Sequence, residues 1–248
     1  MSFRDILRDV VQTTAPIQFE SILLTQEDRG SGKALYIESM TKDRRIVMRA
    51  RAKEVVDEIS KPIGLTNLPL IQGLLGLAAF RGDDTTVIPE MNRTGEEVKA
   101  LVFSSSGGSS TVMVQQSKFH ISMPNANSQT FDVIITPTAA SISELKNFSS
   151  TFAANKISNN VTPYTEDNKL KFFIGDADKN NHNGVLVFAD TEDELKRGYF
   201  YATERIMQCF SRANQASELK MSISSRGAIR IDVDTGVANY EFYVLGGS

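Results

Sequence analysis

The chain of 248 residues contains no tryptophan, one cysteine and two histidines. A single cysteine excludes an intramolecular disulfide and fits a reducing compartment. Cys209 falls on the apolar side of an expected helix, where a buried thiol is more ordinary than a reactive one. His120 and His182 are far apart in the sequence, and neither has the spacing of a metal site or a nucleophilic triad. The sequence therefore predicts no metal, no cofactor and no enzymatic activity.

Long apolar runs and an excess of positive charge are also absent. The most apolar segment, Leu68 to Phe80, is too short to span a bilayer, and residues 1–15 carry charges where a secretory signal would be apolar. The formal net charge of -3 argues against a general nucleic-acid coat or a basic membrane-surface protein. We therefore expect a cytoplasmic protein that binds no membrane and contacts any nucleic acid only locally.

Two segments resemble ligand-binding loops but lack residues that such loops require at fixed positions. In residues 175–184, Asp176, Asp178 and Asn180 alternate as in a calcium loop, but the sixth and twelfth positions hold the wrong residues. The run Gly30 to Lys33 lacks the leading glycine and the hydroxyl of a phosphate-binding loop. Both segments are interpreted as turns.

Hydrophobic periodicity predicts four helices, two in each half of the chain. Asn67 is the expected N-cap of the second helix, and Ser141 with Glu144 is expected to form a capping box for the third. Short strands fill the remainder, with a flexible hairpin loop at Ser104–Ser110. The expected helices are Phe3–Val11, Leu68–Phe80, one that begins at Ser141, and Thr203–Ala213; the expected strands are Phe19–Leu24, Ala34–Ser39, Arg44–Arg51, Val98–Phe103, Thr111–Gln115, Lys118–Met123, Phe131–Ile135, Lys169–Gly175, Val185–Asp190, Tyr199–Ala202, Leu219–Ser224, Ala228–Val233 and Ala238–Leu245.

The order of elements is the same in the two halves, which predicts two similar domains. The polar segment Pro124–Thr130 is the expected linker, so the domains are expected at 1–123 and 131–248. Two helices per half, each with one apolar stripe, can pack on one face of an antiparallel sheet. The predicted fold class is α+β, with two similar domains that each carry two helices on one face of an antiparallel sheet.

Cations stand beside the apolar stripes of three expected helices. Arg4 and Arg8 are one turn apart on the first helix, and Arg205 and Arg212 share a face of the last. Lys146 faces away from the apolar stripe of the third. These residues are either ordinary solvated positions or a local site for a polyanion.

A second basic cluster follows one expected strand. Arg45, Arg49, Arg51 and Lys53 alternate and therefore share one face of a sheet. We interpret them as a charged outer face that discourages aggregation between sheets.

Three stretches of the sequence carry a family resemblance. The first is an amphipathic helix and its continuation, FRDILRDVVQTTAPIQFESILL, and the second contains an apolar helix, LTNLPLIQGLLGLAAFRGDDTTV. The third, ERIMQCFSRANQASELKMSISSRGAIRIDVDTGVANYEFYVLGG, is a helix followed by three strands. In this order they resemble the DNA polymerase sliding clamps of tailed bacteriophages of the T-even type and, more distantly, proliferating cell nuclear antigen.

The resemblance implies a processivity factor that works as a ring of three identical subunits. Helices would line a hole around duplex DNA, and a clamp loader and a replicative polymerase would be its partners, in the host cytoplasm if the protein is viral. Cations in the hole would contact phosphates without reading sequence. The apolar helix Leu68–Phe80 supplies almost no charge, which departs from a lining built by all four helices. The expected DNA-facing residues are Arg4, Arg8, Lys146, Arg205 and Arg212.

The same resemblance implies an apolar groove for partner peptides, near the linker and the carboxy terminus. The residue types at the matching positions suit an apolar peptide anchor, although each also suits an ordinary core or strand position. The matching positions are Met123, Pro124, Phe131, Tyr243, Val244 and Leu245.

Two other functions stay open at this point. One is a ring-forming viral structural or assembly protein without DNA-sliding activity. The other is an enzyme whose site has no recognisable motif.

Overall fold

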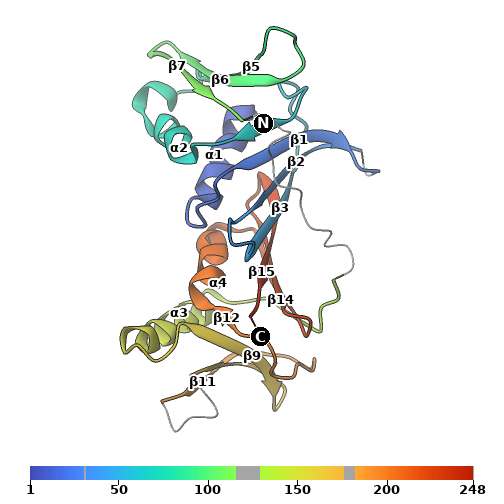
Figure 1. Cartoon of the computed structure of the whole chain (residues 1–248), viewed down its shortest axis with the longest axis vertical. Helices are drawn as coiled ribbons and strands as arrows, with labels where there is room; N and C mark the ends of the chain where they lie inside the picture. The colour runs from blue at the N-terminus through green and yellow to red at the C-terminus, as the bar shows by residue number, and fades with distance from the viewer. Residues whose placement is uncertain (31, 116–128, 176–181, 248) are drawn as a thin grey trace. The chain divides into compact units, whose positions relative to one another are not determined.

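The computed structural model describes residues 1–30, 32–115, 129–175 and 182–247, which form two compact units (Figure 1). The first unit comprises Met1–Lys42, Val47–Met123 and Thr235–Tyr240; the second comprises Asp43–Ile46, Pro124–Asp234 and Glu241–Ser248. None of the helices in the described ranges is long and apolar enough to cross a lipid bilayer.

The first unit begins with helix α1 (Phe3–Thr14), whose start is fixed by a capping box. The Asp5 amide donates to the Ser2 hydroxyl at 3.3 Å, and the Ser2 amide donates to the Asp5 carboxylate at 3.1 Å. The helix continues one turn beyond the expected end at Val11. Its apolar stripe, Phe3, Ile6, Leu7 and Val10, is fully buried.

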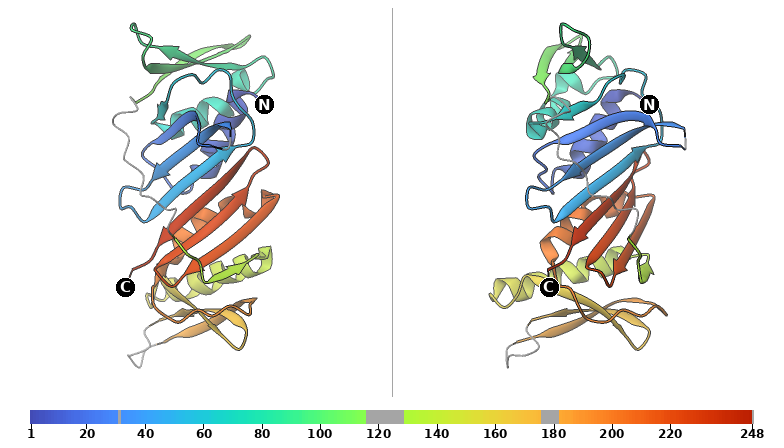
Figure 2. Two further views of the ribbon diagram at one scale, coloured as in Figure 1. Left: turned by 90° about the vertical axis from the view of Figure 1, so that its right-hand side faces the viewer. Right: turned by 45° about the vertical axis from the view of Figure 1, so that its right-hand side comes forward.

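The sheet of the first unit contains β1 (Ile22–Asp28), β2 (Lys33–Met40), β3 (Ile46–Ala52) and β4 (Ile63–Leu65) in the order β4-β1-β2-β3. Helix α2 (Leu68–Gly76) packs against α1, and both lie on one face of this sheet (Figure 2). A short 3-10 helix, η1 (Ala78–Phe80), follows α2. A second sheet has the order β5-β6-β7, with β5 (Thr86–Met91), β6 (Val98–Ser105) and β7 (Gly108–Met113).

Helix α2 differs from the expected Leu68–Phe80 at its end and in its cap. Asn67 occupies the N-cap position in a left-handed conformation, and its side chain makes no capping hydrogen bond. The α-helix ends at Gly76 because Leu77 is extended, and only the 3-10 helix η1 continues to Phe80.

The hairpin expected around Ser104–Ser110 is present, but its loop is shorter than predicted, because the strands extend to Ser105 and from Gly108. These residues belong to a β6–β7 hairpin in which Ser105 pairs with Gly108. The Ser105 hydroxyl donates to the Ala79 carbonyl at 2.6 Å, and the Ser106 amide donates to the Asp84 carboxylate at 2.9 Å. The serines are therefore ordered by neighbours that are distant in sequence.

The second unit contains helix α3 (Ala139–Ala154), which starts earlier than its expected capping box. Thr138 is the N-cap: the Ser141 amide donates to the Thr138 hydroxyl at 3.0 Å, and the Thr138 amide donates to the Ser141 hydroxyl at 3.1 Å. The expected Ser141–Glu144 capping box is wrong, because Thr138 is the N-cap and Ser141 is the third residue of the helix. The last helix is α4 (Thr203–Cys209), and it continues as a 3-10 helix, η3 (Phe210–Gln215).

Helices α3 and α4 cover one face of the strands β15-β14-β13-β8 (Figure 2). These are β8 (Val133–Ile135), β13 (Glu218–Ser224), β14 (Ala228–Asp234) and β15 (Ala238–Leu245), and they agree with the expected strands. The other sheet of the second unit has the order β11-β10-β9-β12. Its strands are β9 (Asn160–Glu166), β10 (Lys169–Ile174), β11 (Gly184–Asp190) and β12 (Tyr201–Ala202).

Two of the strands that the sequence did not predict contain a proline, which cannot donate to a strand ladder. Strand β5 contains Pro89 and lies at a sheet edge, where one side needs no donor. Strand β9 contains Pro163, and its neighbour β12 pairs only with Val161 and Asn160. The third, β4, has only three residues. The expected strand Lys118–Met123 lies outside the described residues.

Each unit is completed by a turn from the other half of the sequence. In the first unit, the buried Asp9 carboxylate accepts hydrogen bonds from the Thr235 hydroxyl at 2.9 Å and the Tyr240 hydroxyl at 2.7 Å. The Lys53 amide donates to the Val237 carbonyl at 3.0 Å. We call the Asp9, Thr235 and Tyr240 contacts the Asp9 clasp.

In the second unit, the turn that comes from the first half of the sequence is Asp43–Ile46. Arg205 of α4 forms an ion pair with Asp43, and the Arg45 carbonyl accepts from the Leu245 amide at 2.9 Å. The Arg45 guanidinium donates to the Gly246 carbonyl at 2.7 Å. The units are thus not two consecutive pieces of chain. The expected linker 124–130 begins in residues that the structure does not describe, so the predicted domain bounds stay a prediction.

We expect Tyr240→Phe to lower the free energy of unfolding by about 1.5–3 kcal/mol, because a buried carboxylate loses one of its donors. Urea denaturation with a circular dichroism readout measures this difference. Tyr36→Phe is the matched control, since the Tyr36 ring stacks on Arg29 and its hydroxyl has no hydrogen-bond partner among the described residues. A loss no larger than that of the control would contradict a stabilising clasp.

Candidate nucleic-acid interface

The two arginines of α1 have different environments. Arg4 is only 9% exposed, and its guanidinium donates to the Gly82 carbonyl and lies 3.7 Å from the Asp83 carboxylate. Arg4, which was expected to face DNA, is therefore largely covered by the loop after η1. Arg8 is half-exposed and forms no ion pair with any described residue.

Lys146 is exposed on α3, next to the fully buried Leu145. It has no ion-pair partner within the described ranges. Its neighbour along the helix surface, Asn147, is uncharged and exposed. This ammonium group is therefore available to an anionic ligand.

The arginines of the last helix are both half-buried. The Arg205 guanidinium lies 2.5 Å from the Asp43 carboxylate, so part of its charge is already compensated. Arg212 lies on η3, beyond the end of the α-helix at Cys209. The structure therefore leaves Arg8 and Lys146 as the least engaged cations of the expected set.

The apolar groove that the sequence predicted is only partly present. Met123 and Pro124 lie outside the described residues. Val244 is fully buried in the core, so its assignment to an accessible groove is wrong: alternation along β15 turns it toward the helices. Leu245 is exposed at the end of β15.

Phe131 and Tyr243 belong to a polar and aromatic cluster on the opposite face of the β13–β15 strands. The Arg230 guanidinium lies 5.1 Å from the centre of the Phe131 ring, and it pairs with Asp232 at 3.0 Å. The Tyr243 hydroxyl donates to Glu241 at 2.8 Å, and burial raises the pKa of Tyr243 to about 12.

Three members of this cluster, Arg230, Asp232 and Glu241, were missed in the sequence. Burial raises the pKa of Asp232 above its ordinary value in spite of the adjacent Arg230, which lowers it. The signal was the polar alternation within β14, where Arg230 and Asp232 interrupt the apolar series Ile229, Ile231 and Val233.

Of the second basic cluster, Arg49 and Arg51 lie on strand β3, whereas Arg45 and Lys53 flank it. Arg49 stands opposite Glu38, and Arg51 stands opposite Tyr36. Arg29 donates to Glu38 at 3.1 Å and stacks 4.0 Å from the centre of the Tyr36 ring. This arrangement fits the interpretation as a charged outer face.

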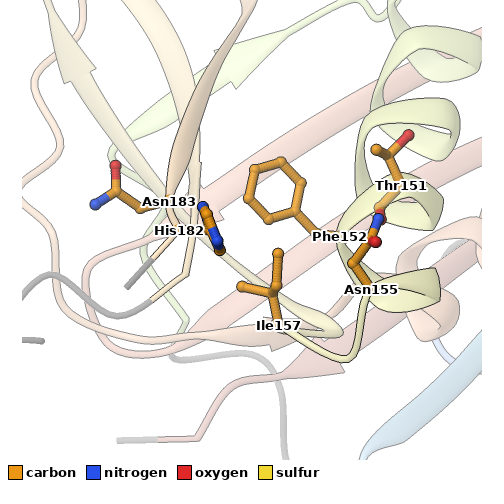
Figure 3. Close-up of a pocket in the computed structure, with 6 residues that line it drawn as sticks. All are labelled: Thr151, Phe152, Asn155, Ile157, His182 and Asn183. Atoms are coloured by element: carbon orange, nitrogen blue, oxygen red, sulfur yellow. The ribbon is translucent and has the colours of Figure 1, made fainter. Parts of the chain in front are cut away.

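A pocket of about 450 Å³ lies between the end of α3 and residues 182–183 (Figure 3). The Phe152 ring and His182 border the same space, with Asn155 and Thr151 on the helix side. Among the described residues of the lining, His182 is the only titratable side chain, so these residues bring together no acid–base pair. Across the described parts of the chain, no group of three or more His, Cys, Asp or Glu side chains could hold a metal ion.

No family model and no curated protein matches this sequence. Solved structures match over nearly the whole chain. PCNA, proliferating cell nuclear antigen, from Thermococcus kodakaraensis aligns with 100% of this chain and 98% of its own, with a TM-score of 0.68 and 12% identity. The chain has the PCNA-like clamp fold.

Two further PCNA structures give the same result. A. fulgidus PCNA, bound to the C-terminal region of FEN-1, aligns with 100% of this chain and 97% of its own, at a TM-score of 0.65 and 12% identity. The PCNA2–PCNA3 complex of Sulfolobus tokodaii aligns with 99% and 97%, also at a TM-score of 0.65 and 12% identity. The predicted α+β class, with antiparallel sheets and two similar domains, is confirmed by this PCNA-like fold.

Cys209 should not react with a chromogenic disulfide reagent in the native protein at pH 8. It is 1% exposed, and burial raises the pKa of its thiol, so both access and the thiolate fraction are low. Asn147→Cys is the control, because that position is exposed on α3. One reactive thiol is expected in the variant and none in the parent until denaturant is added; rapid labelling of the parent would contradict the burial of Cys209.

Proposed function

We propose that this chain is a sliding clamp: a DNA polymerase processivity factor that closes as a ring around duplex DNA and tethers a replicative polymerase. The observation that carries the proposal is the PCNA-like fold over all of this chain and 98% of the T. kodakaraensis chain. The fold alone does not specify a function, so the proposal also uses the sheet edges and the charges of the helices.

A ring requires several copies of the chain. A compact chain of 248 residues has a radius of gyration of about 18 Å, which is too small for one subunit to enclose a duplex. Three copies are proposed from the resemblance to clamps. Such a ring uses a head-to-tail interface that closes on itself.

Two edge strands supply a physical basis for that interface. Strand β7 is the edge of its sheet in the first unit, and Met113 on it is 64% exposed. Strand β11 is the edge of its sheet in the second unit, with Val185 and Val187 both 47% exposed. Unpaired edges with exposed apolar side chains favour association. We propose that β7 of one copy pairs with β11 of the next.

The helices supply a DNA contact without base recognition. Arg8, Lys146, Arg205 and Arg212 are proposed to face the duplex, with Arg8 and Lys146 as the freest groups. Lone cations on helices bind phosphate oxygens and exchange between them, which permits sliding. Retention on DNA then comes from ring closure. The site needs no catalytic group, cofactor or metal.

Partner peptides are proposed to dock beside the interdomain segment and the carboxy terminus. Phe131, Tyr243 and exposed Leu245, with Met123 and Pro124, are the proposed contact residues. The bound FEN-1 region in the A. fulgidus PCNA structure supports peptide binding as a use of this fold. A replicative polymerase and a clamp loader are the proposed partners, and an origin in a T-even type bacteriophage, with action in the host cytoplasm, remains part of this proposal.

Protein loaded on circular duplex DNA should survive a high-salt wash and be lost once the circle is cut. The measurement compares protein retained on immobilised circular and linear DNA of one sequence, after binding to both is verified at low salt. Val187→Arg places a charge in the proposed interface. It should therefore abolish the difference in retention between circular and linear DNA, and it should reduce the mass measured by light scattering to that of one chain, 27.4 kDa. Val55→Arg, at an exposed loop position, is the control.

Equal loss from circles and lines would contradict the proposal. A stable ring that shows no topological retention would favour a viral structural or assembly protein instead.

The variant Arg8→Glu with Lys146→Glu should fold and assemble normally but load poorly on DNA. Both side chains lack ion partners among the described residues, so we expect unfolding free energies within about 0.5 kcal/mol of the parent. Arg205→Glu is a poorer probe, since it would place a second carboxylate beside Asp43. Lys61→Glu, which makes the same type of charge change on an exposed loop, is the control. Loading equal to that of the control would exclude Arg8 and Lys146 from the DNA-facing surface.

A further inference from the structure

Helix α2 has an apolar surface on both sides. Its buried side is formed by Leu68, Ile71 and Leu75, as in any packed helix. Its exposed side is also apolar: Leu70 is 44% exposed, and Leu77 just beyond the helix is 51% exposed. No residue from 68 to 80 carries a charge.

The exposed side of α2 is also recessed at Gly73, which has no side chain. Gly73 lies in the helix interior, and a Cβ built there would meet no atom within 4 Å. The packing of this chain therefore gives no steric reason for a glycine, although glycine inside a helix costs about 0.5–1 kcal/mol relative to alanine. The result is an exposed helix surface on which Gln72 is the only long polar side chain.

The other helical segments differ from α2 in the groups that they expose. Helix α1 exposes part of Arg8, α3 exposes Lys146, and α4 with η3 exposes parts of Arg205 and Arg212. Each of these helical segments thus exposes at least part of a cationic side chain, whereas α2 offers none.

We propose that α2 is an uncharged, recessed sector of the DNA channel, and that duplex phosphates are contacted by α1, α3 and α4–η3 but not by α2. This inference rests on the proposed clamp function. A phosphate near an apolar surface gives up hydration without gaining a hydrogen bond, so phosphates are bound at the cationic helices and not at α2. Around a closed ring, charged and uncharged sectors then alternate.

The arrangement limits the number of phosphates that are bound at one time. Electrostatic attachment grows with each neutralised phosphate, and the salt dependence of binding grows with it. A channel with an uncharged sector in every protomer holds the duplex by fewer contacts and opposes sliding less.

Site-directed cross-linking tests this inference on the loaded ring. Gln72→Cys on α2 and Asn147→Cys on α3 each replace an exposed, uncharged side chain. A short thiol-linked photo-crosslinker labels only the introduced cysteine, because Cys209 is buried. With the ring loaded on circular duplex DNA, we expect several-fold more protein–DNA cross-link from position 147 than from position 72.

The outcomes separate the inference from the function on which it rests. Equal or greater cross-linking from position 72, on a ring retained by circles, would overturn the inference and leave the clamp function standing. Retention without cross-linking from either position would overturn the helix lining as well as the inference. Absence of topological retention would overturn the clamp function itself.

A charge grafted onto α2 gives a second measurement. Gln72→Lys should slow the diffusion of the loaded ring along DNA several-fold at low salt, and the difference should vanish as salt is raised. Gln72→Ala is the matched control and should diffuse as the parent does. Unchanged diffusion in Gln72→Lys, combined with lost polymerase binding, would overturn the inference and assign α2 to a protein partner.

Discussion

The first unit depends on the hydrogen bonds that the buried Asp9 carboxylate accepts. This carboxylate holds the turn between β14 and β15 through the hydroxyls of Thr235 and Tyr240, which are separated from it by most of the sequence. A buried carboxylate without these donors would carry a large desolvation cost. In the second unit, the Asp43–Ile46 turn comes from the first half of the sequence, and its partners are Arg205 and the main chain near Leu245. Sequence halves and structural units are therefore different divisions of this chain.

Elements whose apolar spacing is regular could be predicted from the sequence. The strands β13 and β14 alternate between apolar and polar residues, as does the first half of β15, and the bounds of all three agree with the expected ones to within a residue. Helix α1 was recognised from Phe3, Ile6, Leu7 and Val10, although its end was placed too early. Strands β5 and β9 were missed because their prolines contradict a strand pattern until it is known that β5 is an edge strand and that β12 does not pair with Pro163 of β9. The hairpin at Ser104–Ser110 was recognised, but its loop was predicted too long because serines favour turns unless tertiary partners such as Ala79 and Asp84 hold them in place.

The candidate site was less predictable because exposure depends on contacts between distant segments. Arg4 and Arg8 have the same helical context in sequence, but only Arg4 lies under the Gly82–Asp83 loop. The same limitation applies to Val244 and Tyr243, which are consecutive: alternation places one in the core and the other beside Arg230. Lys146 was placed correctly on the solvent side of its helix, since the buried Leu145 fixes the orientation of α3. Its role toward DNA remains a proposal, because no sequence or structural feature of a lone lysine specifies its ligand.

Because each unit contains a turn from the other half of the sequence, neither unit can fold from one consecutive stretch of the chain as it leaves the ribosome. Domains usually fold as units, with the amino-terminal one first, as the chain emerges. Here residues 235–240 belong to the first unit but are translated after residues 124–234 of the second. The nascent amino-terminal half must therefore wait, with Asp9 lacking its Thr235 and Tyr240 donors, until these residues have emerged. The first unit then reaches its final form only after most of the second has been synthesised, which makes native folding a late and joint event.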